Sequence, residues 1–331
     1  MKKEKYPEGK KINLIFIGTP DFGVPSLNAL SKDDGFNILA VITQPDKKSG
    51  RGQIMSYPSI KKEALKLENE LGIKIPILQP DKISNIEEKI KKLNPDIIIV
   101  IAYAQLIPEN ILNIPKYGCI NIHGSLLPKY RGAACIQEAI LQGDKKTGIS
   151  FMLMDKKLDT GAIIKNLSIP INNSDTTGSI FDKLAVLSAE KIGDVLKKYI
   201  SGKIKPVPQD NSKATYVKTL SKKDGHLDWN KPALELERFI RAMTPWPSAF
   251  SYLDKKIIKI LRSAPRVKTS AEIVKINKYK AGEIFSEDKK LFIQCKENSL
   301  EILEIQIEGG KKLQAQDFLN GHSDFIGMIL K

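Results

Sequence analysis

The chain has 331 residues and a formal net charge of +15, and 41% of its residues are hydrophobic and 27% charged. This balance is typical of a folded, water-soluble protein, and the length favours two domains over one. Every apolar run is far shorter than the ~18 residues that a membrane-spanning helix needs. The Lys-rich start also lacks the features of a secretory signal, so we predict a cytoplasmic protein without a membrane partner. Separately, we expect a monomer.

Cysteine and histidine are too scarce to indicate a disulfide framework or a metal site. The chain has three of each, and no two cysteines form a C-x-x-C pair. We therefore expect no metal. The positive charge has two interpretations, because it attracts a polyanion such as nucleic acid but also follows from a merely Lys-rich composition. Charge alone leaves both open.

Apolar runs alternate with amphipathic stretches from residue 12 to residue 200. We predict strands at 12–17, 36–43, 73–78, 96–102, 118–123 and 148–155, and helices at 59–71, 84–93, 133–142 and 176–200. Strands nearly continuous in Ile and Val, separated by helices, indicate a Rossmann-like α/β domain with a mostly parallel sheet. Ligands of such sheets bind beyond the carboxyl ends of the strands, where we expect Asp21, Gln44, Tyr103 and His123.

The pattern changes after residue 200. Residues 201–214 are rich in Gly, Pro, Lys and Ser and indicate a linker. Short alternating strands follow at 257–261, 291–295 and 300–307, with one helix at 233–243. Such strands suggest a small OB-like β-barrel. The predicted plan is a basic extension at 1–11, a catalytic domain at 12–200, the linker, and the barrel at 215–331.

The segment 119–128 carries the strongest chemical indication. Asn121 and His123 are two residues apart on a predicted strand, so their side chains point to the same face. An amide donor and an imidazole together suit acyl transfer, because they can stabilise an oxyanion and move a proton. Two structural polar residues with satisfied hydrogen bonds would give the same pattern, so this segment alone leaves both interpretations open.

A second predicted loop, at 154–161, places Asp159 shortly before Gly161. A carboxylate directed at His123 would orient the imidazole and favour its protonated form. We find no Ser or Cys in a position to act as a covalent nucleophile. The sequence therefore favours direct transfer over a covalent acyl-enzyme.

Taken together, these motifs resemble those of the methionyl-tRNA formyltransferases, within the folate-dependent formyltransferases. The resemblance extends over residues 12–331 and is carried by the segments 16–22, 43–46, 50–52, 121–134, 158–161, 228–229 and 241–247. The Asn-x-His-x-Ser-Leu-Leu-Pro block at 121–128 is highly specific for the folate-dependent enzymes.

The resemblance implies an activity and a set of site residues. The α-amino group of initiator methionyl-tRNA would attack the formyl carbon of 10-formyltetrahydrofolate, the formyl donor, for translation initiation. Asn121 and His123 would stabilise the oxyanion, and Asp159 would pair with His123. Folate contacts are expected from Ser125, Leu126, Leu127 and Pro128, and also from Tyr103 after the strand at 96–102.

The segment between residues 44 and 57 is long for a strand–helix connection, and such loops are usually functional or disordered. Lys47, Lys48 and Arg51 make it basic. By resemblance this loop enters the tRNA acceptor stem, with the barrel as a second tRNA-binding part. Without the resemblance, a solvated surface loop would be the simpler interpretation.

Two departures and one rival accompany the resemblance. The family usually has Pro at the position of Cys135 and Gly at the position of Ala104. A UDP-aminosugar formyltransferase, with the same folate donor, is the nearest alternative. The basic loop and the net charge favour tRNA. A non-catalytic RNA-binding protein on the same fold is disfavoured by the intact trio of Asn121, His123 and Asp159.

Overall fold

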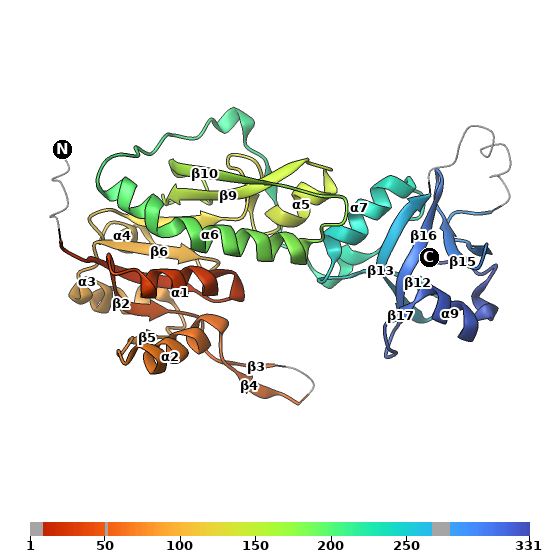
Figure 1. Cartoon of the computed structure of the whole chain (residues 1–331), viewed down its shortest axis with the longest axis horizontal. Coiled ribbons are helices and arrows are strands. Elements are labelled where there is room, and N and C mark those ends of the chain that lie inside the picture. The colour runs from red at the N-terminus through yellow and green to blue at the C-terminus, as the bar shows by residue number, and fades with distance from the viewer. Residues whose placement is uncertain (1–8, 50–51, 267–278) are drawn as a thin grey trace. The chain divides into compact units, whose positions relative to one another are not determined.

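The chain forms two compact units in a computed structural model that describes residues 9–49, 52–266 and 279–331 (Figure 1). The first unit comprises Met1–Cys135, Lys146–Pro170 and Phe181–Val217, and the second comprises Ile136–Lys145, Ile171–Ile180 and Lys218–Lys331. Most of the predicted extension at 1–11 lies outside the described residues. None of the described helices is long and apolar enough to cross a membrane.

The first unit is built on a seven-stranded sheet. Its order is β10 (Ile163–Pro170), β9 (Lys146–Leu153), β7 (Cys119–His123), β6 (Ile97–Ile101), β1 (Ile12–Gly18), β2 (Phe36–Ile42), β5 (Ile77–Leu78). The strands from β7 to β5 pair in parallel, whereas β9 runs antiparallel to both of its neighbours. The predicted Rossmann-like, mostly parallel sheet is confirmed. Strand β10 was not predicted.

Helices cover both faces of this sheet, which explains why its strands are apolar on both sides. One face packs against α3 (Glu87–Leu93) and α4 (Glu109–Leu112) in a core that includes Ile17, Ile98, Ile90 and Ile111. The helices α1 (Val24–Lys32), α2 (Ser59–Leu71) and α6 (Thr177–Ile200) complete the layer structure (Figure 1). The hydroxyls of Ser26 and Ser188, 2.7 Å apart, join α1 to α6.

The carboxyl ends of the parallel strands meet at one edge of the sheet. The Gln44 side chain, after β2, donates from Nε2 to the Tyr103 carbonyl after β6 at 3.3 Å. His123 is the last residue of β7. Beyond it, β8 (Arg131–Gly132) pairs in parallel with β11 (Tyr216–Val217). The chain just after the predicted linker thus returns to the predicted site.

The segment predicted as a long loop at 44–57 instead contains a β-hairpin. Strands β3 (Lys47–Ser49) and β4 (Ile54–Ser56) pair antiparallel. Lys61 on α2 contacts both ends of the hairpin, because its Nζ lies 2.6 Å from Asp46 Oδ2 and 4.1 Å from the centre of the Tyr57 ring. These strands are too short and polar to stand out in the sequence, but their pairing satisfies the backbone.

The second unit holds an antiparallel sheet in the order β12 (Ala249–Leu253), β13 (Lys256–Arg266), β16 (Ser299–Ile307), β15 (Lys290–Gln294), β14 (Ile284–Glu287). A short strand, β17 (Leu313–Gln314), also pairs with β16. The unit further contains α7 (Ala233–Met243), α9 (Ala315–Gly321) and most of α5 (Cys135–Leu141). Within the described residues β12 and β14 are edge strands that do not pair with each other, so the predicted closed barrel is not confirmed.

Candidate active site

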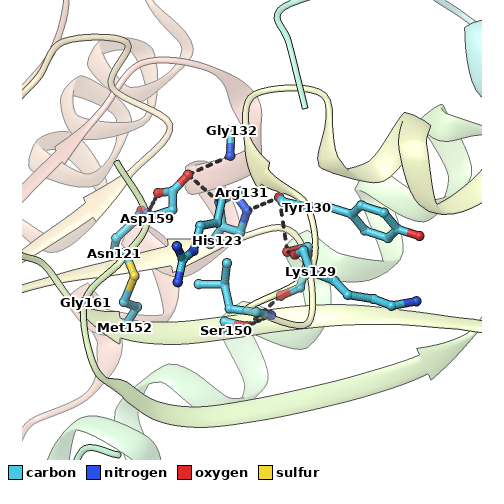
Figure 2. A network of polar contacts seen from close by, with 12 residues as sticks. Asn121, His123, Lys129, Tyr130, Arg131, Gly132, Ser150, Met152, Asp159 and Gly161 are labelled. Atoms are coloured by element: carbon cyan, nitrogen blue, oxygen red, sulfur yellow. Dashed lines mark hydrogen bonds and ion pairs between the residues drawn. The ribbon is translucent and has the colours of Figure 1, made fainter. Parts of the chain in front are cut away.

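The structure brings the three predicted catalytic side chains together. Asn121 is half-buried, and His123 and Asp159 are buried. Asn121 donates from Nδ2 to Asp159 Oδ1 at 3.5 Å, and His123 Nδ1 lies 3.8 Å from Asp159 Oδ2. Figure 2 shows the Asp159 carboxylate close to Asn121, His123 and Gly132. The two-residue spacing on β7 therefore directs amide and imidazole to the same face, where both lie near one carboxylate.

Asp159 sits in a tight loop that the surrounding chain holds in place. Its φ is +53°, a left-handed conformation that Asp adopts more readily than most residues with a Cβ but that is still uncommon outside glycine. The Gly132 N–H donates to Asp159 Oδ2 at 2.8 Å. A Cβ on Gly161 would lie 1.8 Å from the Leu153 carbonyl oxygen, so only glycine lets the loop approach β9 this closely.

The second ring nitrogen of His123 also faces an oxygen, because Nε2 lies 2.9 Å from the Tyr130 carbonyl (Figure 2). Burial alone would lower the pKa of His123. Cys135, the Asp159 carboxylate and the Tyr130 carbonyl outweigh that effect and raise the pKa from 6.5 to about 9. An imidazole between two acceptors is most stable with both nitrogens protonated. The raised pKa therefore favours the protonated ring at neutral pH. The thiol of Cys135, the position where the family usually has proline, is among the groups that influence the ring.

The predicted folate-contact stretch forms a buried turn. The Ser125 hydroxyl donates to the Lys129 carbonyl at 2.6 Å. The Ser150 hydroxyl donates to the Ser125 carbonyl at 2.6 Å and accepts from the Leu127 N–H at 2.9 Å. Ser125 and Leu127 are buried, whereas Leu126 and Pro128 are half-buried. The turn shapes the chain that presents the Tyr130 carbonyl to His123.

Tyr103 belongs to the core of the first unit rather than to an open surface. Its side chain is 2% exposed and packs in the cluster with Ile98 and Ile111. Burial raises the pKa of its hydroxyl to about 12. Only its carbonyl, which accepts from Gln44, ties it to the polar edge of the sheet.

The loop that carries Asp159 also lines a cavity of about 750 Å³. The cavity is lined by apolar side chains such as Leu112 and Met154, by the cations Lys156, Lys157 and Arg131, and also by the carboxylates Glu109 and Asp155. None of the five residues predicted to contact folate lines it. Across the described residues, no cluster of three His, Cys or acidic side chains could hold a metal ion.

The hairpin of β3 and β4 presents a different kind of surface. Lys47 and Lys48 are exposed on β3. On β4, Ile54 is 73% exposed and Met55 is 53% exposed. Arg51, the third predicted tRNA contact, lies outside the described residues. The described part of the hairpin is therefore basic on one strand and apolar on the other.

Comparisons with known proteins identify the family. Residues 10–196 match the Formyl transferase family, and residues 219–323 match the Formyl transferase, C-terminal domain family. The methionyl-tRNA formyltransferase of Caldanaerobacter subterraneus subsp. tengcongensis is 43% identical over 97% of this chain and 100% of its own length. The methionyl-tRNA formyltransferase of Clostridium novyi is 40% identical over the same shares.

Solved structures at lower identity share the fold. An N-formyltransferase from Helicobacter canadensis, in complex with folinic acid and dTDP-3-aminofucose, has a TM-score of 0.64 at 18% identity, over 91% of this chain and 100% of its own. HypX from Aquifex aeolicus, in complex with tetrahydrofolic acid, has a TM-score of 0.60 at 15% identity, covering 96% of this chain. This chain spans 48% of the length of HypX. The relatives with 40–43% sequence identity over nearly the whole chain show that it belongs to the methionyl-tRNA formyltransferase family.

Proposed function

We propose that the chain transfers the formyl group of 10-formyltetrahydrofolate to the α-amino group of initiator methionyl-tRNA. The observation that carries this proposal is the geometry of the buried His123 imidazole, placed with Asn121 around the carboxylate of Asp159. Relatives that are 40–43% identical over nearly the whole chain carry the name of this activity. Translation initiation is a cytoplasmic process, so the proposal also assigns the protein to the cytoplasm.

In the proposed reaction the α-amine attacks the formyl carbon, and a tetrahedral oxyanion forms. The Asn121 amide donates to that oxyanion, an interaction typically worth about 3–4 kcal/mol per donor, and the positive charge of protonated His123 stabilises it electrostatically. Asp159 accepts the proton that the amine loses and passes it, through water, to N10 of the folate as the formyl–N10 bond breaks. The new bond is the formyl–amine bond. No covalent enzyme intermediate is required.

The donor is proposed to bind at the carboxyl end of β7, where His123 and the turn of Leu126 and Pro128 lie. The cavity of about 750 Å³ borders Tyr117 and Gly118 at the other end of that strand, and none of Asn121, His123 and Asp159 lines it. We therefore do not assign the donor to that cavity. The half-buried Leu126 and Pro128 remain proposed folate contacts. The buried Ser125, Leu127 and Tyr103 would instead support the backbone that forms the folate site.

The hairpin is the proposed contact with the acceptor stem. Exposed Lys47 and Lys48, with Arg51 added from the sequence, would neutralise phosphates. Exposed Ile54 and Met55 are of the type that inserts between base steps. We also retain the proposal that the second domain, from residue 215, is an OB-like barrel that binds tRNA.

The function is tested by incubating the pure protein with 10-formyltetrahydrofolate and charged initiator methionyl-tRNA. We expect formyl-methionyl-tRNA, and only slow transfer to a UDP-linked aminosugar in the same assay. A protein that binds the tRNA but forms no formyl-methionine would contradict the enzyme proposal. Preference for the aminosugar would instead establish the rival.

A further inference from the structure

Gln209, in the segment that the sequence indicates as a linker, lies between Arg131 and the Asp159 loop. Its Nε2 donates to the Asp159 carbonyl at 2.9 Å and to the Gly161 carbonyl at 2.8 Å. Its Oε1 accepts from Arg131 Nη2 at 2.8 Å and from Nε at 3.2 Å. A guanidinium only donates and a carbonyl only accepts, so the orientation of the amide is unambiguous.

Arg131 gives Gln209 a fixed support. Its side chain is 1% exposed, and it donates to two further neutral acceptors, Asn211 Oδ1 at 2.7 Å and the Tyr216 hydroxyl at 2.8 Å. A buried guanidinium with several acceptors is costly to move, because each lost hydrogen bond leaves a desolvated donor. Gln209 therefore couples the catalytic loop to a rigid cation.

The same segment also supports the other partner of His123. Thr215 Oγ1 accepts from the Tyr130 N–H, and the Thr215 carbonyl accepts from the Arg131 N–H, both at 2.8 Å. Tyr130 presents its carbonyl to His123 Nε2. Residues 209–217 thus hold both oxygen acceptors that flank the imidazole, one through Gln209 and one through Thr215.

We propose that Gln209 is a positioning residue that holds the strained Asp159 loop so that the carboxylate stays beside His123. This inference rests on the catalytic role proposed for Asp159. Without the two donations from Nε2, the backbone of Asp159 would be free to leave its left-handed conformation. Only the Gly132 N–H and the long hydrogen bond from Asn121 would then hold the carboxylate.

Two substitutions separate this role from a purely structural one. Gln209→Met has a similar length and removes both the donor and the acceptor. Gln209→Glu keeps an acceptor for Arg131, which favours folding, but turns an oxygen toward the two carbonyls. A matched control is Gln306→Met, because Gln306 also donates to a backbone carbonyl, that of Gly310, on a surface hairpin.

We expect both Gln209 variants to lose at least about tenfold in kcat, with little change in KM for tRNA. In Gln209→Met, the NMR titration midpoint of His123 should fall by at least about half a unit, because the carboxylate is less closely held. The chain has three histidines, so the signal is readily assigned. Gln306→Met should match the wild type in both measurements.

Wild-type kcat in either Gln209 variant, or an unchanged His123 midpoint in Gln209→Met, would overturn the positioning role. The titration requires no turnover. An inactive wild-type protein would therefore count against the proposed function, while the titration would still decide the role of Gln209.

Discussion

The site around His123 and the hairpin of β3 and β4 differ in burial and in how firmly they are held. His123 is 7% exposed and both of its ring nitrogens face fixed oxygens, whereas Ile54 on the hairpin is 73% exposed. Chemistry on a formyl group needs preorganised donors and little water. Recognition of a polyanion needs exposed cations that a long ligand can reach. On the proposed function, this difference would place the reaction and the choice of acceptor in separate parts of the chain.

Asp159→Asn should give the largest effect. The amide keeps the shape of the side chain but loses the charge that holds the imidazolium and accepts the proton, so kcat should fall by about 10²–10³-fold. Folate affinity, measured by calorimetry, should change little. Asp194→Asn on α6, which removes an exposed carboxylate paired with Lys198, is the matched control. Equal losses of folate affinity and turnover would mean that Asp159 is structural.

Removing the two hairpin cations should have an intermediate effect, confined to the acceptor. Lys47→Ala combined with Lys48→Ala should raise the KM for tRNA about tenfold, leave kcat nearly intact, and flatten the salt dependence by roughly one to two units of slope. Arg51→Ala should act in the same direction. The matched control is Lys91→Ala combined with Lys92→Ala on α3, which removes two positive charges far from the hairpin in sequence and should leave the KM for tRNA nearly unchanged. An unchanged salt slope would exclude the hairpin from the tRNA interface.

The pH dependence should report the charge on His123. With its pKa raised to about 9, kcat/KM should fall as pH rises through that value. The stability that the imidazolium contributes should be complete below about 6.5, the unfolded pKa, and lost as pH rises through about 9. Denaturant unfolding across this range measures it.

Cys135→Ala sharpens the same test, because Cys135 is among the groups that raise the pKa of His123. The variant should stay active, and the fall of its kcat/KM at alkaline pH should begin at a lower pH than in the wild type. Loss of all activity would indicate a covalent role for the thiol and would contradict direct transfer. If kcat/KM fell at the same alkaline pH as in the wild type, the thiol would not influence the imidazole.

The smallest effect is expected at Ala104, where the family usually has glycine. Its φ is +64°, a conformation that glycine adopts without strain. Ala104→Gly should therefore raise the free energy of unfolding by up to about 1 kcal/mol. Thermal melting measures this change. A lower Tm would show that the Ala104 methyl makes contacts worth more than the strain.

Local patterns allowed much of the fold to be predicted. The helix at 59–71 and the helix at 233–243 have the predicted bounds, because their apolar periods and flanking prolines are clear. Asn121 and His123 were predicted to point the same way from spacing alone. The hairpin was missed because its strands are only three residues long. Strand β10 was missed because it is an edge strand of mixed polarity, defined by its pairing with β9 rather than by its own sequence.

The parts of the site that lie on a single strand or in a single loop, such as Asn121, His123 and Asp159, could be predicted from the sequence. The support of Asp159 by Gln209 was not, because the two residues are fifty positions apart and Gln209 lies in a segment without periodicity. The burial of Ser125 and Leu127 was also hidden, since the Ser150 hydroxyl that ties the turn comes from β9. Such contacts depend on the assembled sheet.

One measurement tests the separation of chemistry from acceptor choice most directly. Formylation rates of full methionyl-tRNA and of methionyl-adenosine, which lacks an acceptor stem, are compared in the wild type and in the Lys47→Ala, Lys48→Ala variant. We predict that the variant loses about tenfold in kcat/KM with tRNA and nothing with methionyl-adenosine. Equal losses on both acceptors would contradict the account, because the hairpin would then serve the reaction itself.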